Sequence, residues 1–258
     1  MMRAANWRNP LLCFAACLLV LTALEVPAAA GAPVKRPAEA YVDPSAQYPV
    51  DVYDPWEGFN RGVYRLNYYL DYYLLLPAVD VYEFVVPTFA RRGIHNFLRN
   101  LNEPRNFVNS LLQGRAEGCV NAVMRFTLNT SLGIGGLLDP ATPAGYRRRD
   151  EDFGQTLGVW GMGPGPYLVL PMLGPSSLRD GSGLAADMAF YNWWTDMIIE
   201  SASGSGKKRD LIRYGLFVQD AVDTRSALDF RYFETGSPFE YELVRFLYSK
   251  WREFEIRY

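Results

Sequence analysis

The sequence predicts an all-α fold, built as a single helical domain with little or no β-sheet. Apolar residues recur at helical spacing over most of the chain after residue 54, and the alternation typical of strands is nearly absent. Helix start and stop signals separate these periodic stretches. The composition is globular, because 49% of the 258 residues are hydrophobic and 21% are charged. This is enough apolar mass for a sizeable core.

The net charge gives no indication of a nucleic-acid partner. The chain has 26 Lys and Arg against 28 Asp and Glu, for a formal net charge of -2, so it carries no overall basic footprint for a phosphate backbone. Aromatic residues are plentiful at 15%, including 17 Tyr and 6 Trp. Tyr and Trp have apolar bodies and polar tips, which suit protein interfaces or the boundary between membrane and water.

Residues 1–30 are typical of a signal peptide, so we expect the protein to be exported. A basic start and an apolar run from Leu11 to Leu24 precede the small residues Ala28 to Ala30, where cleavage is expected. The alternative is a lipobox ending at Cys17, in which case this cysteine would carry a lipid anchor and become the first mature residue.

Residues 31–53 are rich in Pro and Ala and lack helical periodicity, which indicates an extended tether. No internal repeat is visible after it. One helical domain, residues 54–258, is therefore the simplest count.

The first predicted helix begins at Asp54 and runs to about Leu76. Asp54 fits the N-cap and Pro55 the first helical position, while Glu57 would complete a capping box. Its second half has almost no polar face. Such a helix lies in a core or contacts lipid, but prolines at 77 and 87 keep the apolar run below the roughly 18 residues that a spanning helix needs.

The later helices follow the same signals. The predicted bounds are Thr88 to Leu101, Pro104 to Leu112, Ala116 to Leu132 and Leu184 to Ile199, with Gly114 and Gly133 as terminators. A further helix carries one apolar face from Leu211 to Tyr232, and a last one, opened by Ser237, carries an apolar stripe from Phe239 to Phe254.

Residues 133–180 change character and are rich in Gly and Pro. Within them, Tyr167 to Leu170 is bracketed by Pro166 and Pro171, which predicts a short extended or re-entrant segment. Two interpretations stay open from the pattern. The segment is a loop of the core, or it lines a cavity, because irregular backbone at membrane depth persists only where protein or water satisfies it.

The sequence predicts no catalytic residue, metal site or cofactor. It lacks the G-x-S-x-G, H-E-x-x-H, Walker A and EF-hand patterns, and its single histidine, His95, makes a His-based metal site improbable. The turn 161–165 lacks a phosphate-binding amide at Pro164. A lipid hydrolase that combines His95 with Ser176 or Ser182 is kept as an alternative.

Seven blocks stand out in order between Asp54 and about Tyr191: DPWEGFNR (54–61), NFLRNL (96–101), NSLLQG (109–114), RFTLNT (125–130), FGQTLG (153–158), GPYLVLP (165–171) and LRDG (178–181). Together they resemble the MlaA (VacJ) family of outer-membrane lipoproteins. The chain departs from the family in its weak lipobox around Cys17 and in ending at Tyr258 without a long polar tail.

The resemblance implies a ring-like helical domain embedded in the outer membrane, on its periplasmic side, with an amphipathic channel. It implies transport of mislocalised outer-leaflet phospholipids to a periplasmic lipid-carrier protein, in association with a trimeric outer-membrane porin and without bond chemistry. The implied channel residues are Met162, Tyr167, Leu168, Val169, Leu170, Met172 and Leu173. The candidates for the membrane interface are Trp56, Tyr68, Tyr69, Tyr72 and Tyr73. The alternative function is a non-catalytic scaffold of the cell envelope.

Overall fold

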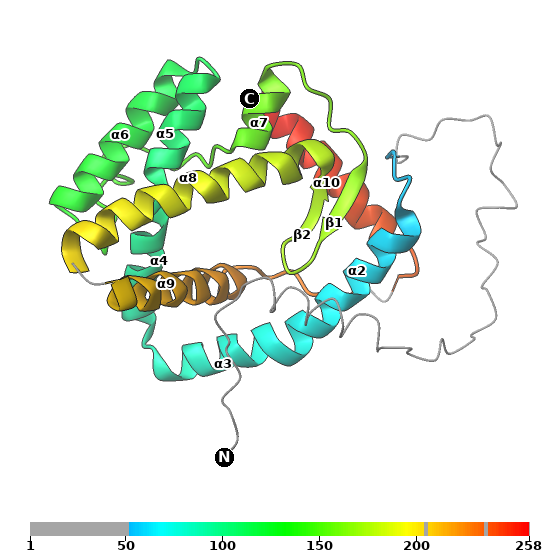
Figure 1. Cartoon of the computed structure of the whole chain (residues 1–258), viewed down its shortest axis with the longest axis horizontal. Coiled ribbons are helices and arrows are strands. Elements are labelled where there is room, and N and C mark those ends of the chain that lie inside the picture. The colour runs from blue at the N-terminus through cyan, green and yellow to red at the C-terminus, as the bar shows by residue number, and fades with distance from the viewer. Residues whose placement is uncertain (1–51, 204–205, 235–236, 258) are drawn as a thin grey trace, which may run out of the picture. The chain divides into compact units, whose positions relative to one another are not determined.

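A computed structural model describes residues 52–203, 206–234 and 237–257 of the chain (Figure 1). These ranges belong to one compact unit, Pro49–Tyr258. The described part is mostly helical and contains a single two-stranded sheet, which confirms the all-α prediction. The predicted signal peptide, the alternative anchor Cys17 and residues 31–51 of the predicted tether lie outside the described residues.

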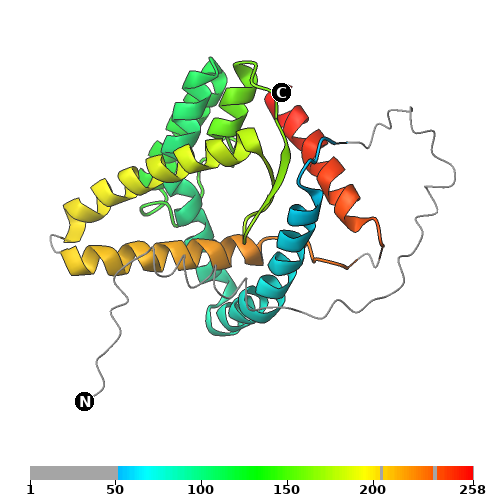
Figure 2. The ribbon, with the colours of Figure 1, turned by 45° about the vertical axis from the view of Figure 1, so that its right-hand side comes forward.

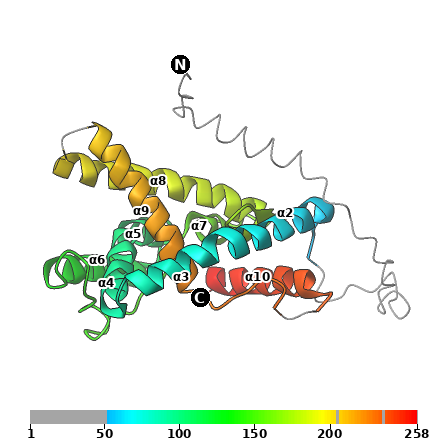
Figure 3. The same cartoon turned by 90° about the horizontal axis from the view of Figure 1, so that it is seen from below.

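The first helix extends well beyond its predicted end at Leu76. Helix α2 (Glu57–Leu70) continues through η2 (Asp71–Leu75), a π-helical turn, into α3 (Leu76–Val85), as Figure 3 shows. The prediction was wrong because Pro77 falls in the first turn of α3, just after the widened π-helical turn, where its missing amide interrupts no regular helical hydrogen bond. The helix ends at Val86, which is extended ahead of Pro87.

The capping box predicted at Asp54 is also wrong. The helix begins at Glu57, and the N-cap position Trp56 makes no side-chain hydrogen bond to it. The Asp54 carboxylate accepts instead from the Tyr241 hydroxyl at 2.5 Å and from Arg245 Nη1 at 3.1 Å. A buried carboxylate gains more from a cation and a short hydroxyl bond than from neutral helix amides.

Three helices follow the predicted bounds closely. They are α4 (Thr88–Leu101), α5 (Glu103–Leu112) and α6 (Ala116–Ser131). Gly114 has a positive φ of 70° between α5 and α6, as expected for a helix terminator. The two helices approach so closely that a Cβ on Gly118 would lie 2.6 Å from Ser110 Oγ.

Helix α7 (Phe153–Val159) lies inside the Gly- and Pro-rich stretch and was not predicted. The Asp152 carboxylate caps it, accepting from the Gln155 amide at 2.8 Å. The backbones of α7 and α8 (Leu178–Ser203) lie in direct contact. A Cβ added to Gly183 would lie only 2.3 Å from the Gly154 nitrogen, so the contact requires glycine. Helix α8 starts six residues before the predicted Leu184.

Two more helices complete the chain. Helix α9 (Gly206–Ser226) packs beside α8, and α10 (Glu240–Arg257) packs against α7 (Figure 1). We predicted one apolar helical face from Leu211 to Tyr232, but α9 ends at Ser226, so the last residues of that stretch lie beyond the helix.

The sheet is an antiparallel hairpin of β1 (Tyr167–Leu170) and β2 (Gly174–Ser177), in which Tyr167 pairs with Ser177. It lies beside α2 and α10 (Figure 2). A core cluster fills this junction, formed by Val63, Tyr64, Tyr167, Val169 and Tyr241. The Tyr64 ring meets Tyr241 edge-on at 5.8 Å, a favoured aromatic geometry.

The polarity of the described part is largely inverted. Buried polar or charged side chains outnumber buried apolar ones by roughly two to one, while large apolar side chains are exposed on nearly every helix. On α10, the predicted stripe faces outward, with Leu247 54% and Trp251 61% exposed. On α9, Phe217 is 66% exposed whereas Arg225 is buried. Within the described ranges, no helix has both the length and the apolar character needed to cross a membrane.

We expect Asp71→Ala to destabilise the fold by about 3–5 kcal/mol, because it leaves the buried Arg225 guanidinium unpaired. Asp71 holds Arg225 through two hydrogen bonds, of 2.5 and 2.9 Å, between η2 and the end of α9. Glu83→Ala is the control, since Glu83 pairs with Arg91 at the surface and should cost no more than about 1 kcal/mol. Denaturant unfolding in detergent measures both, and equal effects would contradict this account.

Candidate functional site

The candidate site is the hairpin segment, residues 162–177, which contains every predicted channel residue. Its side chains alternate as a pleated strand requires. Tyr167 and Val169 are 1% and 0% exposed and belong to the core cluster, while Leu168 and Leu170 point to the other face and are half-buried. The remaining candidates, Met162, Met172 and Leu173, are exposed before β1 and at the turn.

Two asparagine side chains of α2 bind the backbone of β1 and of the turn that follows it. Asn60 Nδ2 donates to the Tyr167 carbonyl at 3.0 Å, and Asn60 Oδ1 accepts from the Val169 amide at 2.9 Å. Asn67 repeats the pattern further along, donating to the Leu170 carbonyl at 2.9 Å and accepting from the Met172 amide at 2.8 Å. Sequence reasoning missed both residues, although their spacing of seven, which places them on one face of α2, was a visible signal.

The turn of the hairpin is tight. Met172 has a φ of 64° and Gly174 one of 81°, so a non-glycine residue occupies the left-handed region at the tip. Asn67 contacts the backbone at this point, which connects the tip directly to α2.

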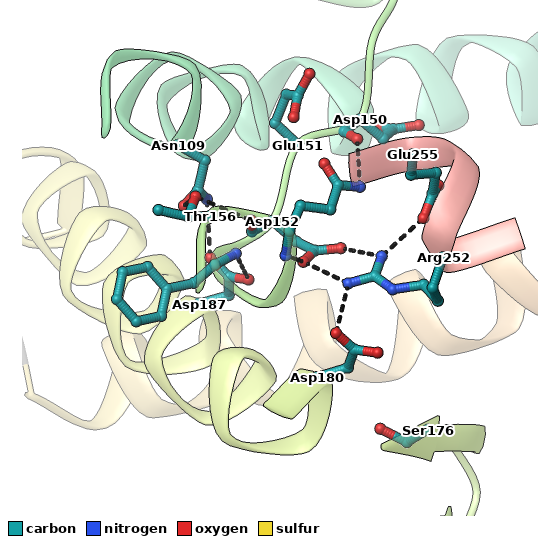
Figure 4. Close-up of polar contacts among 12 residues, drawn as sticks. Asn109, Asp150, Glu151, Asp152, Thr156, Ser176, Asp180, Asp187, Arg252 and Glu255 are labelled. Carbon is teal, nitrogen blue, oxygen red and sulfur yellow. Dashed lines mark hydrogen bonds and ion pairs between the residues drawn. The ribbon is translucent and has the colours of Figure 1, made fainter. Parts of the chain in front are cut away.

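Asp180 ties the base of the hairpin to α8 and α10. Its carboxylate accepts from Ser177 Oγ and from the Tyr248 hydroxyl, each at 2.8 Å, and from Arg252 Nη2 at 3.0 Å (Figure 4). Burial acts to raise the pKa of Asp180, but the hydrogen bonds and the charge of Arg252 outweigh it and lower the pKa overall.

Arg252 of α10 clamps the starts of α7 and α8. It binds both carboxylate oxygens of Asp152, at 2.7 and 2.9 Å, in addition to Asp180 (Figure 4). Burial acts to lower the pKa of Arg252, yet these two carboxylates raise it overall. The arrangement is a bidentate clamp that sets orientation as well as charge.

A second part of this polar network joins α5, α7 and α8. Asp187 accepts from Asn109 Nδ2 at 3.1 Å and from the Phe153 amide at 2.8 Å, and Thr156 donates to Asn109 Oδ1 at 2.9 Å (Figure 4). Burial raises the pKa of Asp187. These groups satisfy one another, so the network serves as a frame for the hairpin segment.

A pocket of about 250 Å³ opens at the base of β1, next to α10. Its lining combines apolar side chains, including Val52 and Ile256, with the basic residues Arg179 and Arg252. A smaller pocket of about 130 Å³ lies between α4 and α6, where Arg99 and Arg125 contribute to the lining.

The predicted interface aromatics lie mostly at the surface of α2 and η2. Trp56, Tyr69, Tyr72 and Tyr73 are 46%, 48%, 54% and 71% exposed. Tyr68 differs, because its ring packs edge-on against Phe233 at 5.2 Å.

The described residues do not assemble the alternative hydrolase. His95 Nδ1 lies 2.7 Å from an Asp223 carboxylate oxygen, which joins α4 to α9. Ser176 Oγ donates to its neighbour's carbonyl at 3.3 Å, and Ser182 Oγ to the Arg179 carbonyl at 2.7 Å. Neither serine is hydrogen-bonded to His95, so the described part contains no serine–histidine pair of the kind that activates a hydroxyl.

Comparison with known proteins gives a consistent group of relatives. A family model described as MlaA lipoprotein matches residues 52–255. The intermembrane phospholipid transport system lipoprotein MlaA of Escherichia coli (strain K12) is 44% identical over 149 residues, 55% of this chain and 59% of that protein. The protein of that name from Haemophilus influenzae is 33% identical over 177 residues, 67% of this chain and 66% of that protein.

Other similarities extend this group. An uncharacterized protein of Rickettsia felis is 40% identical over 131 residues, 51% of this chain and 52% of that protein. The chain thus spans about half to two thirds of the length of these curated relatives. A solved structure described as "Structural basis for maintenance of bacterial outer membrane lipid asymmetry" matches with a TM-score of 0.63 and 35% identity, over 80% of this chain and 100% of that one.

The ion pairs of Asp180 predict a pH-dependent stability. Because the pKa of Asp180 is lowered by folding, its contribution is present above the ordinary carboxyl pKa of about 3.9 and is lost as the pH falls through the folded value. Asp180→Asn should lower the free energy of unfolding by about 3 kcal/mol at pH 7. This difference between the variant and the wild type should narrow below about pH 4. Thermal unfolding from pH 7 to 3 measures it, and a gap independent of pH would contradict the assignment.

Proposed function

The chain belongs to the MlaA lipoprotein family, and on this premise we propose that it moves phospholipid out of the outer membrane and so maintains lipid asymmetry. The relatives from Escherichia coli and Haemophilus influenzae are named as lipoproteins of an intermembrane phospholipid transport system. The similar solved structure concerns outer-membrane lipid asymmetry. The same activity in this chain is the simplest account of its structure.

The single observation that carries the proposal is the inverted polarity of the described part. Soluble domains rarely expose contiguous apolar patches of more than a few hundred Å², but here large apolar side chains are exposed along α3, α6, α9 and α10 while charges are paired inside. Such a surface is stable when lipid covers it. We therefore place the helices in the outer membrane, at its periplasmic side.

The exposed aromatic residues support this placement. Tyr and Trp favour the headgroup level of a bilayer. Trp56, at the start of α2, and Tyr72 and Tyr73, in η2, are all exposed. The family is one of lipoproteins, and the alternative processing at Cys17 would supply an additional anchor, whereas the expected cleavage after Ala30 would leave attachment to the helices themselves.

The hairpin segment is the proposed wall of the lipid path. Leu168 and Leu170 lie on the face of β1 opposite the core cluster, and Met172 and Leu173 extend this apolar surface to the tip. Tyr167 and Val169, which the resemblance also implied as channel residues, fix the strand from behind.

The path must also accommodate the charged headgroup. Moving a phosphate through hydrocarbon is costly, and polar groups beside an apolar wall lower that cost. We propose that a trimeric porin holds the protein in place and that a periplasmic carrier accepts the lipid. Removal of lipid by the carrier then gives direction by mass action.

Leu168→Asp should reduce phospholipid transfer about tenfold or more and leave folding nearly intact, since a half-buried side chain on the outer face of β1 tolerates polarity better than one in a packed core. Val169→Asp is the matched control, because Val169 is fully buried and the same change there should unfold the protein. Transfer from outer-membrane vesicles to a carrier and thermal unfolding measure the two effects. A scaffold role predicts unchanged transfer in folded Leu168→Asp.

The membrane placement is tested on the exposed stripe of α10. A lysine at the lipid-facing midplane costs about 2.5–3.5 kcal/mol, so in a Cys17→Ala background, which removes any acyl anchor, Leu247→Lys together with Trp251→Lys should shift folded protein from the membrane to the carbonate-soluble fraction. Lys250→Ala, at an exposed polar position of the same helix, is the control. Full membrane retention of the double variant would mean that this face contacts protein or water.

A further inference from the structure

We infer that Asn60 and Asn67 of α2 replace a third β-strand and thereby position the hairpin so that Leu168 and Leu170 face the lipid path. The pairing itself is a feature of the fold, whereas its role in transport rests on the proposed function.

The hydrogen bonds reproduce the pattern of a neighbouring strand. One residue of a parallel partner strand donates to the carbonyl of one residue and accepts from the amide two residues later. The Asn60 carboxamide bonds to Tyr167 and Val169 in this way, and the Asn67 carboxamide bonds to Leu170 and Met172. Each carboxamide therefore supplies the donor and the acceptor that one residue of a parallel strand would supply.

The spacing of the two asparagines matches the strand. Seven residues of an α-helix rise about 10.5 Å, almost two full turns, so Asn60 and Asn67 lie on the same face. The groups they bind are three residues apart along the hairpin, so that Asn60 binds within β1 and Asn67 binds where β1 passes into the turn. The helix thus sets the register of the strand, and any other spacing would leave one carboxamide without its partners.

Burial makes both side chains specific for this task. Asn60 and Asn67 are 0% and 2% exposed, and each uses its amide and its carbonyl oxygen on the hairpin. Asn60 also donates to Asp54 Oδ1 at 2.7 Å, and Asp54 is held by Tyr241 and Arg245 of α10. The amide plane of Asn60 is therefore fixed from a second helix.

The two asparagines control different parts of the hairpin. Asn60 binds the strand beside the core cluster, where Tyr167 and Val169 are packed. Asn67 binds the end of the strand and the tip, including Met172 in its left-handed conformation. Because the bonds fix the rotation of β1 about its own axis, they decide which side chains face the core and which face outward.

Amide hydrogen exchange on the full protein in lipid nanodiscs tests the pairing directly. In Asn67→Ala, the Met172 amide should exchange about tenfold faster, while the Val169 amide stays within about twofold of wild type. Asn67→Asp keeps the acceptor and should preserve protection at Met172. Asn129→Ala is the matched control, since this buried asparagine accepts from the Ala141 amide, in the loop after α6, and should leave both hairpin amides unchanged.

A photoreactive side chain in place of Leu168 tests the role in transport. Cross-linking to phospholipid should fall about tenfold in the Asn67→Ala background but not with Asn129→Ala. Unchanged exchange at Met172 would overturn the pairing, and unchanged cross-linking despite faster exchange would overturn the positioning role. Wild-type protein that neither cross-links nor transfers lipid would overturn the proposed function, while the exchange rates would still decide the pairing.

Discussion

The buried carboxylate of Asp54 is the interaction on which the position of the hairpin depends. It accepts from Asn60, Tyr241 and Arg245, and so joins the start of α2, the free edge of β1 and the face of α10. A carboxylate away from water requires charge and hydrogen bonds together, and these three donors supply both. Tyr241 extends the junction by packing edge-on against Tyr64 and Tyr167, at 5.8 and 6.1 Å.

The pairing of buried charges also explains how a domain with polar residues inside and apolar residues outside keeps one defined structure. Apolar contact with lipid does not distinguish one helix arrangement from another, because hydrocarbon tails and leucine side chains are equally apolar. Specificity must then come from the interior, where each unpaired polar group is costly. Pairs such as Glu103 with Arg125 at 2.8 Å and Arg252 with Asp152 hold only in one relative placement of their helices.

The sequence predicted well those helices whose ends carry local start and stop signals. Where helix ends depend on contacts with distant residues, the prediction was less accurate. Helices α4 to α6 match their predicted bounds to within a residue, and Gly114 ends α5 as its backbone freedom suggests. Helix α7 was missed because Gly154 and Gly158 lower local helix propensity, although their role is close packing against Asp180 and Ile256.

The candidate site was predictable only as far as local sequence signals reach. The bracketing prolines located the extended segment, and the alternation within Tyr167 to Leu170 then divided its residues between core and outer face. No local pattern predicted that Asp54 would bind Arg245 instead of capping the helix, because Arg245 lies 191 residues away in the sequence.

That separation in sequence has a consequence for how the chain folds. Asp54, just before the first helix, meets Arg245 of the last helix, so closing the junction requires a very long loop closure, and formation of long-range contacts of this kind is slow. Until α10 forms, Asp54 lacks two of its three donors, Tyr241 and Arg245, and a chain with such an incomplete interior is prone to aggregation. In this topology the junction around Asp54 can therefore close only after the last helix of the chain has formed.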